Sequence, residues 1–301
     1  MAESARRPAM PSLRHLVALH LAVALFGLAG LFGAWLALPP VVIVFGRTTI
    51  AAAALTLVAV AMGELRRPAP GLAANGLVLA LHWVAFFAAV QDAGVAVGLI
   101  GYASFPLFTL ILERATGERR GRGRDWAVAV LVVAGLVLTV PRIDVRDAAV
   151  RGLAWGVLSG ATFAWLAVRN RRYARTVAAR SIALWQNAFA AAVLVPVLAW
   201  WPAGVRWPTP AELGLLLILG LGCTALAHTL FVAALAGVTA HAASVVAALE
   251  PVYGIALAAV LVGERPTAAM LAGCGLLVIA ALVASRDAAA SRGGPAGTIA
   301  P

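Results

Sequence analysis

The chain has 301 residues, of which 63% are hydrophobic and 12% are charged, and its mean hydropathy is +0.96. Soluble domains carry about 25% charged residues, so this composition excludes a soluble protein and predicts an all-α polytopic membrane protein. All 23 basic residues are arginine and the net charge is +11, but the arginines lie in short clusters between apolar segments, so no nucleic-acid partner is expected.

Ten segments along the chain are long and apolar enough to cross a bilayer, which takes about 20 residues of helix. The first follows an arginine-containing tail, as a secretory signal would, but its apolar run is longer than the about 7–15 residues of a signal core. We therefore expect a retained first span. In chain order the expected spans are residues 16–37, 41–63, 72–91, 94–113, 125–141, 151–169, 181–201, 211–235, 239–262 and 267–285.

The arginines also predict the orientation of the chain. Most of them fall in alternate connections between the expected spans, counted from the N-terminal tail, with clusters at residues 119–124 and 169–175. Because cytoplasmic connections are rich in arginine, this pattern places both termini in the cytoplasm. Residues 1–15 form one tail. Residues 286–301, rich in Ala, Gly, Ser and Pro, form a second tail that is expected to be disordered.

Two short motifs occur twice, about half the chain length apart. The sequence FPLF at 105–108 precedes GER at 117–119, and EPVY at 250–253 precedes GER at 263–265. The expected spans divide into five in residues 16–141 and five in residues 151–285, and an odd number of crossings inverts the second set in the bilayer. Inverted repeats are typical of alternating-access transporters.

This arrangement resembles the drug/metabolite transporter superfamily, in its ten-span EamA-type branch. The resemblance covers residues 13–286 and is most specific in the EPVY motif, the second GER triplet and the run GCGLLVI at 273–279. Phe105 departs from the pattern, because it stands where the second half has Glu250. Within the branch, the chain is similar to bacterial amino-acid exporters of the YddG type. The resemblance implies a helical bundle that exports amino acids and related metabolites.

Two ionisable side chains within the expected spans need a partner or a role, because charge is costly in a bilayer. Glu250 lies near mid-depth and is either a proton or substrate-amine site, or a structural carboxylate that joins the halves. Arg47 lies closer to the outer end of its span. It either extends its guanidinium to the interface, pairs with Glu250, or binds a substrate carboxylate.

Further polar and aromatic residues of the spans are candidates for the wall of a central cavity. Aromatic rings there would accept an apolar or aromatic side chain, and the amides would bind ammonium and carboxylate groups. For any one aromatic ring, packing or lipid contact is the alternative. The candidates are His82, Phe86, Tyr102, Trp165, Gln186, Asn187, His228 and Tyr253.

Together with the resemblance, the sequence predicts a secondary exporter of amino acids in a bacterial-type inner membrane, with protons as the candidate coupling ion. It contains no lysine and hence no Walker-type motif, and it lacks GxSxG and HExxH, so neither an ATPase nor another enzyme is expected. The two cysteines have no metal-binding spacing, and we expect neither a metal nor another cofactor. An exporter of another metabolite or drug, a channel, and an intramembrane enzyme are the alternatives.

Overall fold

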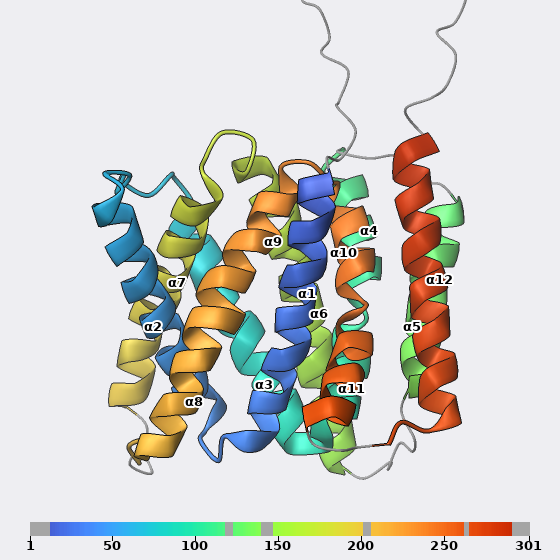
Figure 1. The fold of residues 1–301 in the computed structure, drawn as a ribbon, viewed down its shortest axis with the longest axis horizontal. Coiled ribbons are helices and arrows are strands. Elements are labelled where there is room, and N and C mark those ends of the chain that lie inside the picture. Colours follow the sequence, from blue (N-terminus) through green and yellow to red (C-terminus); the bar gives the residue numbers. More distant parts are fainter. Residues whose placement is uncertain (1–12, 118–122, 140–146, 201–205, 262–264, 291–301) are drawn as a thin grey trace, which may run out of the picture.

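A computed structural model describes residues 13–117, 123–139, 147–200, 206–261 and 265–290. Within these residues every regular element is helical, with twelve α-helices and one π-helix (Figure 1). The elements are α1 (Leu13–Trp35), α2 (Pro40–Ala61), α3 (Leu72–Tyr102), α4 (Phe105–Ala115), α5 (Gly123–Thr139), α6 (Asp147–Tyr173), α7 (Ala179–Ala199), α8 (Pro210–Gly220), η1 (Leu221–Leu226), α9 (Ala227–Leu235), α10 (Ala240–Ala247), α11 (Glu250–Leu261) and α12 (Ala268–Ala290).

The helices coincide with the ten expected segments, and three of those segments are each built from more than one helical element. Seven stretches are long and apolar enough to cross a membrane, and Ala268–Val283 is a shorter apolar helix. The all-α polytopic class is therefore confirmed, whereas the number of ten spans stays a prediction. The seven stretches are Leu13–Trp35, Pro40–Ala61, Leu72–Val95, Val97–Ala115, Ala179–Ala199, Pro210–Leu235 and Ala240–Leu261.

Most boundaries differ from the expected ones by a few residues, and three differences change the organisation of the chain. The third and fourth segments are not separated by a loop, because α3 passes through a kink at Gly94, whose φ of 85° and ψ of 163° suit glycine. Helix α6 runs to Tyr173, beyond the expected end at residue 169. Helix α12 continues to Ala290, into the tail expected to be disordered, in a stretch where alanine favours helix. Most of the expected tails, and Glu118, Arg119, Gly263 and Glu264 of the GER triplets, lie outside the described residues.

The helices cross the bundle in alternating directions (Figure 1). Helix α1 begins and α12 ends at one edge, called here the upper edge, and α4 also ends there. Helix α11 ends at the opposite, lower edge. Helices α5 and α12 pack together at one end of the bundle, and α2 and α7 pack together at the other.

The two copies of the sequence motif occupy matching places in the fold. Helix α3 ends at Tyr102 and α4 begins at Phe105, just as α10 ends at Ala247 and α11 begins at Glu250. A proline follows Phe105 and Glu250 directly, in the first turn of the new helix, where its missing N–H is tolerated. Each motif thus marks a break within an apolar stretch.

Glycines let one helix approach each break closely. A Cβ on Gly160 of α6 would lie 2.7 Å from the carbonyl oxygen of Tyr102, and a Cβ on Gly27 of α1 would lie 2.9 Å from that of Glu250. Helix α6 accordingly packs on α3 and α4, and α1 packs on α9 and α11. Because real Cβ atoms essentially never approach backbone atoms this closely, any larger residue at these two crossings would force the helices to shift.

Candidate substrate cavity

A small buried cavity lies at the centre of the bundle, between helices from both halves of the chain. Its volume is about 40 Å³, enough for a few water molecules but far below the roughly 300 Å³ of a small-molecule site. A metabolite therefore fits into this space only after the helices or side chains move. The lining residues are Phe26, Ala29, Arg47, Leu79, His82, Trp83, Phe86, Tyr102, Phe163, Leu166, Asn170, His228, Phe231 and Glu250.

Arg47 of α2 is buried and does not extend to the membrane interface, since only 2% of it is exposed. Its Nε donates to Thr224 Oγ1 at 2.8 Å, and Nη2 donates to the Cys223 carbonyl at 3.1 Å. Its guanidinium carbon lies 4.1 Å from the ring centroid of Trp83, in cation–π geometry. Both hydrogen-bond acceptors belong to η1, so this π-helix fixes the guanidinium at the cavity wall.

Glu250 is the first residue of α11 and lines the same cavity, with 6% of the residue exposed. Among the described residues its carboxylate has neither a hydrogen-bond donor nor an ion-pair partner within 4.0 Å, Arg47 included. The cavity thus contains one basic and one acidic side chain that do not contact each other directly.

His82 and His228 both contact Trp83, with ring centroids 6.3 Å and 5.9 Å from the centroid of Trp83. The Nδ1 atom of His82 lies 3.0 Å from both the carbonyl oxygen and the Oγ of Ser159 in α6. His228 Nδ1 lies 3.2 Å from the side-chain nitrogen of Asn187, which also donates to the Ala183 carbonyl. Each ring is therefore held by a neighbouring helix and presents a polar group beside the cavity.

Aromatic rings fill most of the space next to these polar groups. The Tyr102 ring centroid lies 5.8 Å from that of Phe86, 4.7 Å from that of Phe105 and 5.5 Å from that of Phe163. Phe163 also contacts Phe231 from α9, with centroids 5.3 Å apart. These distances are typical of tilted and edge-to-face aromatic packing. If the apolar side chain of a substrate entered this space, its contacts with the aromatic rings would replace the contacts that the rings now make with each other.

Buried amides connect the cavity wall to α3 and α7. Asn170 of α6 lines the cavity, accepts from the Asn75 amide at 2.9 Å, and exchanges hydrogen bonds with Gln186. Gln186 is fully buried and reaches the cavity only through Asn170. The amides tie α3, α6 and α7 together, because each buried polar group needs a partner.

The structure brings most of the predicted residues together, but not all of them. His82, Phe86, Tyr102, His228 and the two charged residues line the cavity, and Gln186 and Asn187 lie directly behind it. Trp165 lies elsewhere, with its ring 5.5 Å from the Arg169 guanidinium carbon. The Tyr253 hydroxyl lies 2.7 Å from His20 Nδ1 of α1 and outside the lining.

Several lining residues escaped the sequence analysis. Phe163, Phe231 and Phe26 look like ordinary apolar residues of a span, and Asn170 lies in a stretch that reads as the start of a loop. Asn75 near the start of α3, which donates to Asn170, was a usable signal for this residue. An amide buried in a membrane protein needs a hydrogen-bond partner, so Asn75 indicated that a second amide lies close to it. Within the described part of the chain, no three His, Cys, Asp or Glu residues gather as metal ligands would.

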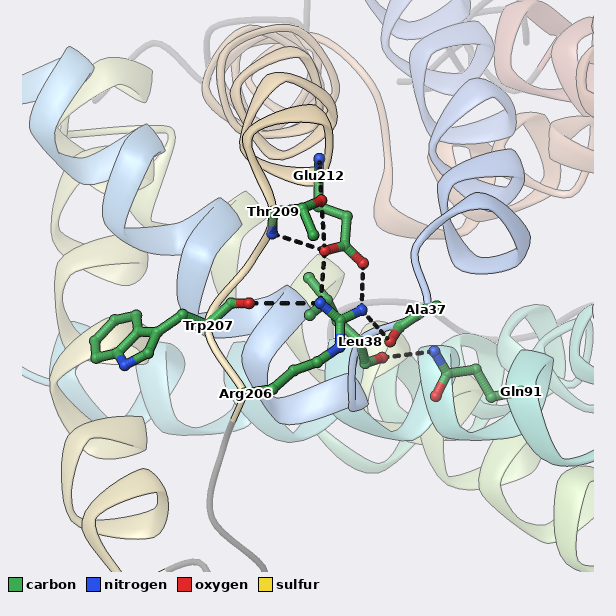
Figure 2. Close-up of polar contacts among 7 residues, drawn as sticks. All are labelled: Ala37, Leu38, Gln91, Arg206, Trp207, Thr209 and Glu212. Atoms are coloured by element: carbon green, nitrogen blue, oxygen red, sulfur yellow. Dashed lines mark hydrogen bonds and ion pairs between the residues drawn. The ribbon is translucent and has the colours of Figure 1, made fainter.

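At the lower edge, an arginine fastens the two halves of the chain to each other (Figure 2). Arg206 forms a double contact with Glu212, Nη1 to Oε2 at 2.8 Å and Nη2 to Oε1 at 2.6 Å, and Nη2 also donates to the Ala37 carbonyl at 3.0 Å. Glu212 in turn caps α8 by a reciprocal contact with Thr209. The neighbouring Leu38 carbonyl accepts from Gln91 of α3. These contacts, called here the lower clasp, hold the α1–α2 connection against α8.

The hydrogen bonds from Arg206 to Glu212 raise the pKa of the Arg206 guanidinium.

Comparison with known proteins identifies the family. The family model described as the EamA-like transporter family matches residues 150–286. The uncharacterized transporter YwfM of Bacillus subtilis (strain 168) is 31% identical over 214 residues, which cover 69% of this chain and 70% of the relative. The chain belongs to the EamA-like transporter family.

The EamA-like fold is also found among solved structures. A crystal structure described only as that of a protein superimposes with a TM-score of 0.77 at 22% sequence identity, over 91% of this chain and 98% of that chain. At this identity the likeness shows a common fold. As a member of a transporter family, the protein is a membrane transporter with a small-molecule substrate.

Proposed function

We propose that this EamA-like protein is a secondary exporter of amino acids, including aromatic and other apolar ones, and of related metabolites. It has ten spans in two inverted repeats, residues 16–141 and 151–285, with both termini in the cytoplasm of a bacterial-type cell. The repeats move against each other so that the central cavity opens alternately to the two sides of the inner membrane. Protons are the candidate coupling ion.

The observation that carries this proposal is the cavity itself. It lies between helices of both halves and combines buried charges with an aromatic wall. Polar groups at this depth are expensive in a membrane, so a buried basic side chain and a buried acidic side chain beside aromatic rings favour a polar solute with an apolar portion. The arrangement suits an amino acid better than a phosphorylated metabolite, because Arg47 is the cation among the lining residues.

The matching positions of the two motifs support the inverted repeat. The breaks before Phe105 and Glu250, and the glycines that pack against them, are what a duplicated five-helix unit would place at corresponding points. The small cavity volume supports a carrier over an open channel, because the space must open and close for each solute that passes.

The function is tested with purified protein in liposomes loaded with unlabelled amino acid. Labelled amino acids from a panel are added outside, and their uptake is measured with and without a pH gradient. Saturable, trans-stimulated uptake of apolar or aromatic amino acids supports the proposal, and dependence on the gradient supports proton coupling. Non-saturable flux that does not respond to internal solute identifies a channel, and no uptake across the panel assigns the protein to another solute.

Sidedness is tested separately with single cysteines at Thr116 and Thr267, in a variant that lacks the native Cys223 and Cys274. An inverted repeat predicts that a membrane-impermeant reagent labels Thr116→Cys from the cytoplasmic side and Thr267→Cys from the outside. Labelling of both cysteines from the same side refutes the inversion.

A further inference from the structure

We infer that Arg47 and Glu250 are the two poles of one binding site for the head group of an amino-acid zwitterion. The substrate carboxylate binds the unused edge of the Arg47 guanidinium, and the substrate ammonium binds the Glu250 carboxylate. This inference rests on the proposed function and specifies how the same cavity recognises its substrate.

The first argument is the geometry of Arg47. A guanidinium has donors on three nitrogens, and here Nε is bonded to Thr224 and Nη2 to Cys223. The ring of Trp83 covers a face of the group. Among the described residues Nη1 has no acceptor, although only 2% of Arg47 is exposed. A buried cation with an unused donor edge at a cavity wall is a site for an anion, and a planar carboxylate fits that edge.

The anchoring of Arg47 also explains the π-helix. Thr224 Oγ1 donates to the Leu219 carbonyl, so its lone pairs remain free to accept from Arg47 Nε. The Cys223 carbonyl lies within the wider turn at Leu221–Leu226 and accepts from the same guanidinium. Short π-helical turns within α-helices commonly occur at functional sites. A guanidinium fixed at two points loses little freedom when it binds a ligand, so the anchor is prepared for its carboxylate.

The second argument is Glu250. Its carboxylate faces the same cavity, is nearly fully buried, and has no donor among the described residues. It belongs to the first turn of α11, where the partial positive charge of a helix N-terminus favours a carboxylate. A buried carboxylate without a donor is the natural counterpart of an ammonium group, which has three donors and no acceptor.

The third argument is the pairing of charges. An anionic substrate would give Arg47 a partner and leave the Glu250 carboxyl without one, and a cationic substrate would do the reverse. A zwitterion supplies a partner to each pole at once, so it alone leaves neither buried ionisable group without a partner. Its side chain then lies against the aromatic rings of Phe86, Tyr102 and Phe163, which border both poles.

The test compares phenylalanine with two analogues that each lack one charge, phenethylamine and 3-phenylpropanoate. Each is used as a competitor of labelled phenylalanine uptake into liposomes, for the wild-type protein and for Arg47→Gln and Glu250→Gln. The wild-type protein is expected to prefer phenylalanine at least about tenfold over either analogue, by the cost of an unpaired buried charge. Arg47→Gln loses the preference over phenethylamine, and Glu250→Gln loses the preference over 3-phenylpropanoate.

The control is Arg169→Gln, because Arg169 also stacks on aromatic rings but does not line the cavity. It is expected to keep both preferences. The ratio of the inhibition constants of two competitors, measured on the same variant, does not depend on the fraction of that variant that is folded. For a variant that folds but does not transport, the same three compounds are compared by thermal stabilisation of the purified protein.

The outcomes separate the inference from the proposed function. If the wild-type protein takes up amino acids but does not prefer phenylalanine to its analogues, or if the two variants keep both preferences, the inference is overturned and the proposed function stands. If the wild-type protein takes up no amino acid of the panel, both are overturned. Crossed loss of preference in the two variants supports both.

Discussion

The replacement of Gly27 by alanine tests the link between helix packing and the cavity. A Cβ at this position would lie 2.9 Å from both the Glu250 carbonyl oxygen and the Gly254 nitrogen. Both are backbone atoms, so α1 or α11 must shift, and overpacking of this kind costs about 1–3 kcal/mol. Because alanine favours a helix by about 1 kcal/mol over glycine, the net loss is smaller than the steric cost.

Gly30→Ala, one turn along the same helix, is the matched control. No atom lies within 4 Å of a Cβ at Gly30, so this variant gains the helix preference without the clash. The difference between the two variants isolates the steric cost, and we expect it to be about 1–3 kcal/mol in favour of Gly30→Ala.

The assay is unfolding of the purified variants in mixed micelles with increasing denaturing detergent, followed by amino-acid counterflow in liposomes. We expect Gly27→Ala to unfold earlier and to transport more slowly, since the clash displaces the residue that carries the Glu250 carboxylate. If Gly27→Ala is as stable and as active as Gly30→Ala, the close approach of α1 to α11 is not needed and the reasoning fails.

Three further predictions concern other parts of the site. Asn170→Leu leaves Gln186 and Asn75 without their shared partner, and is expected to cost about 1 kcal/mol in detergent unfolding; wild-type stability would argue against the amide network. Tyr102→Ala is expected to change the preference between large and small amino acids in liposome competition more than Trp165→Ala does, because Tyr102 lines the cavity and Trp165 does not; equal effects would remove this distinction. Arg206→Gln, Glu212→Gln and the double variant are all expected to increase amide hydrogen exchange in the first turn of α8 by the same amount, because each of them removes the same contact. If the effects of the two single substitutions add in the double variant, the lower clasp does not act as one unit.

The helices were largely predictable, since a membrane helix must bury about 20 apolar residues and polar or breaking residues mark its ends. The breaks inside the apolar stretches were harder to place. Pro106 and Pro251 lie at two of these breaks, but Gly94 carries no comparable signal, and the π-helix at Leu221–Leu226 has an ordinary apolar sequence. Such local changes in backbone geometry depend on neighbouring helices, which the sequence of one segment does not report.

The ionisable residues of the candidate site were predictable, because burying such residues in a membrane is costly. Arg47 and Glu250 stand out because an ionisable group in a span needs a reason, and both line the cavity. The aromatic candidates were less secure. Tyr102 faces the cavity, whereas Trp165 stacks with Arg169 and Tyr253 pairs with His20, because an aromatic ring is equally stable at several places in an apolar bundle.

The sequence by itself determined the class of the protein, the positions of its membrane helices and the few polar side chains that a bilayer would not tolerate without a role. These follow from the free energy of transfer into lipid, which each segment carries in its own composition. Only the tertiary structure decided which face of each helix meets which neighbour, that Arg47 is held by the π-helix, and that its free edge shares a cavity with Glu250. Those contacts join residues far apart in the chain, so they exist only once the helices have packed.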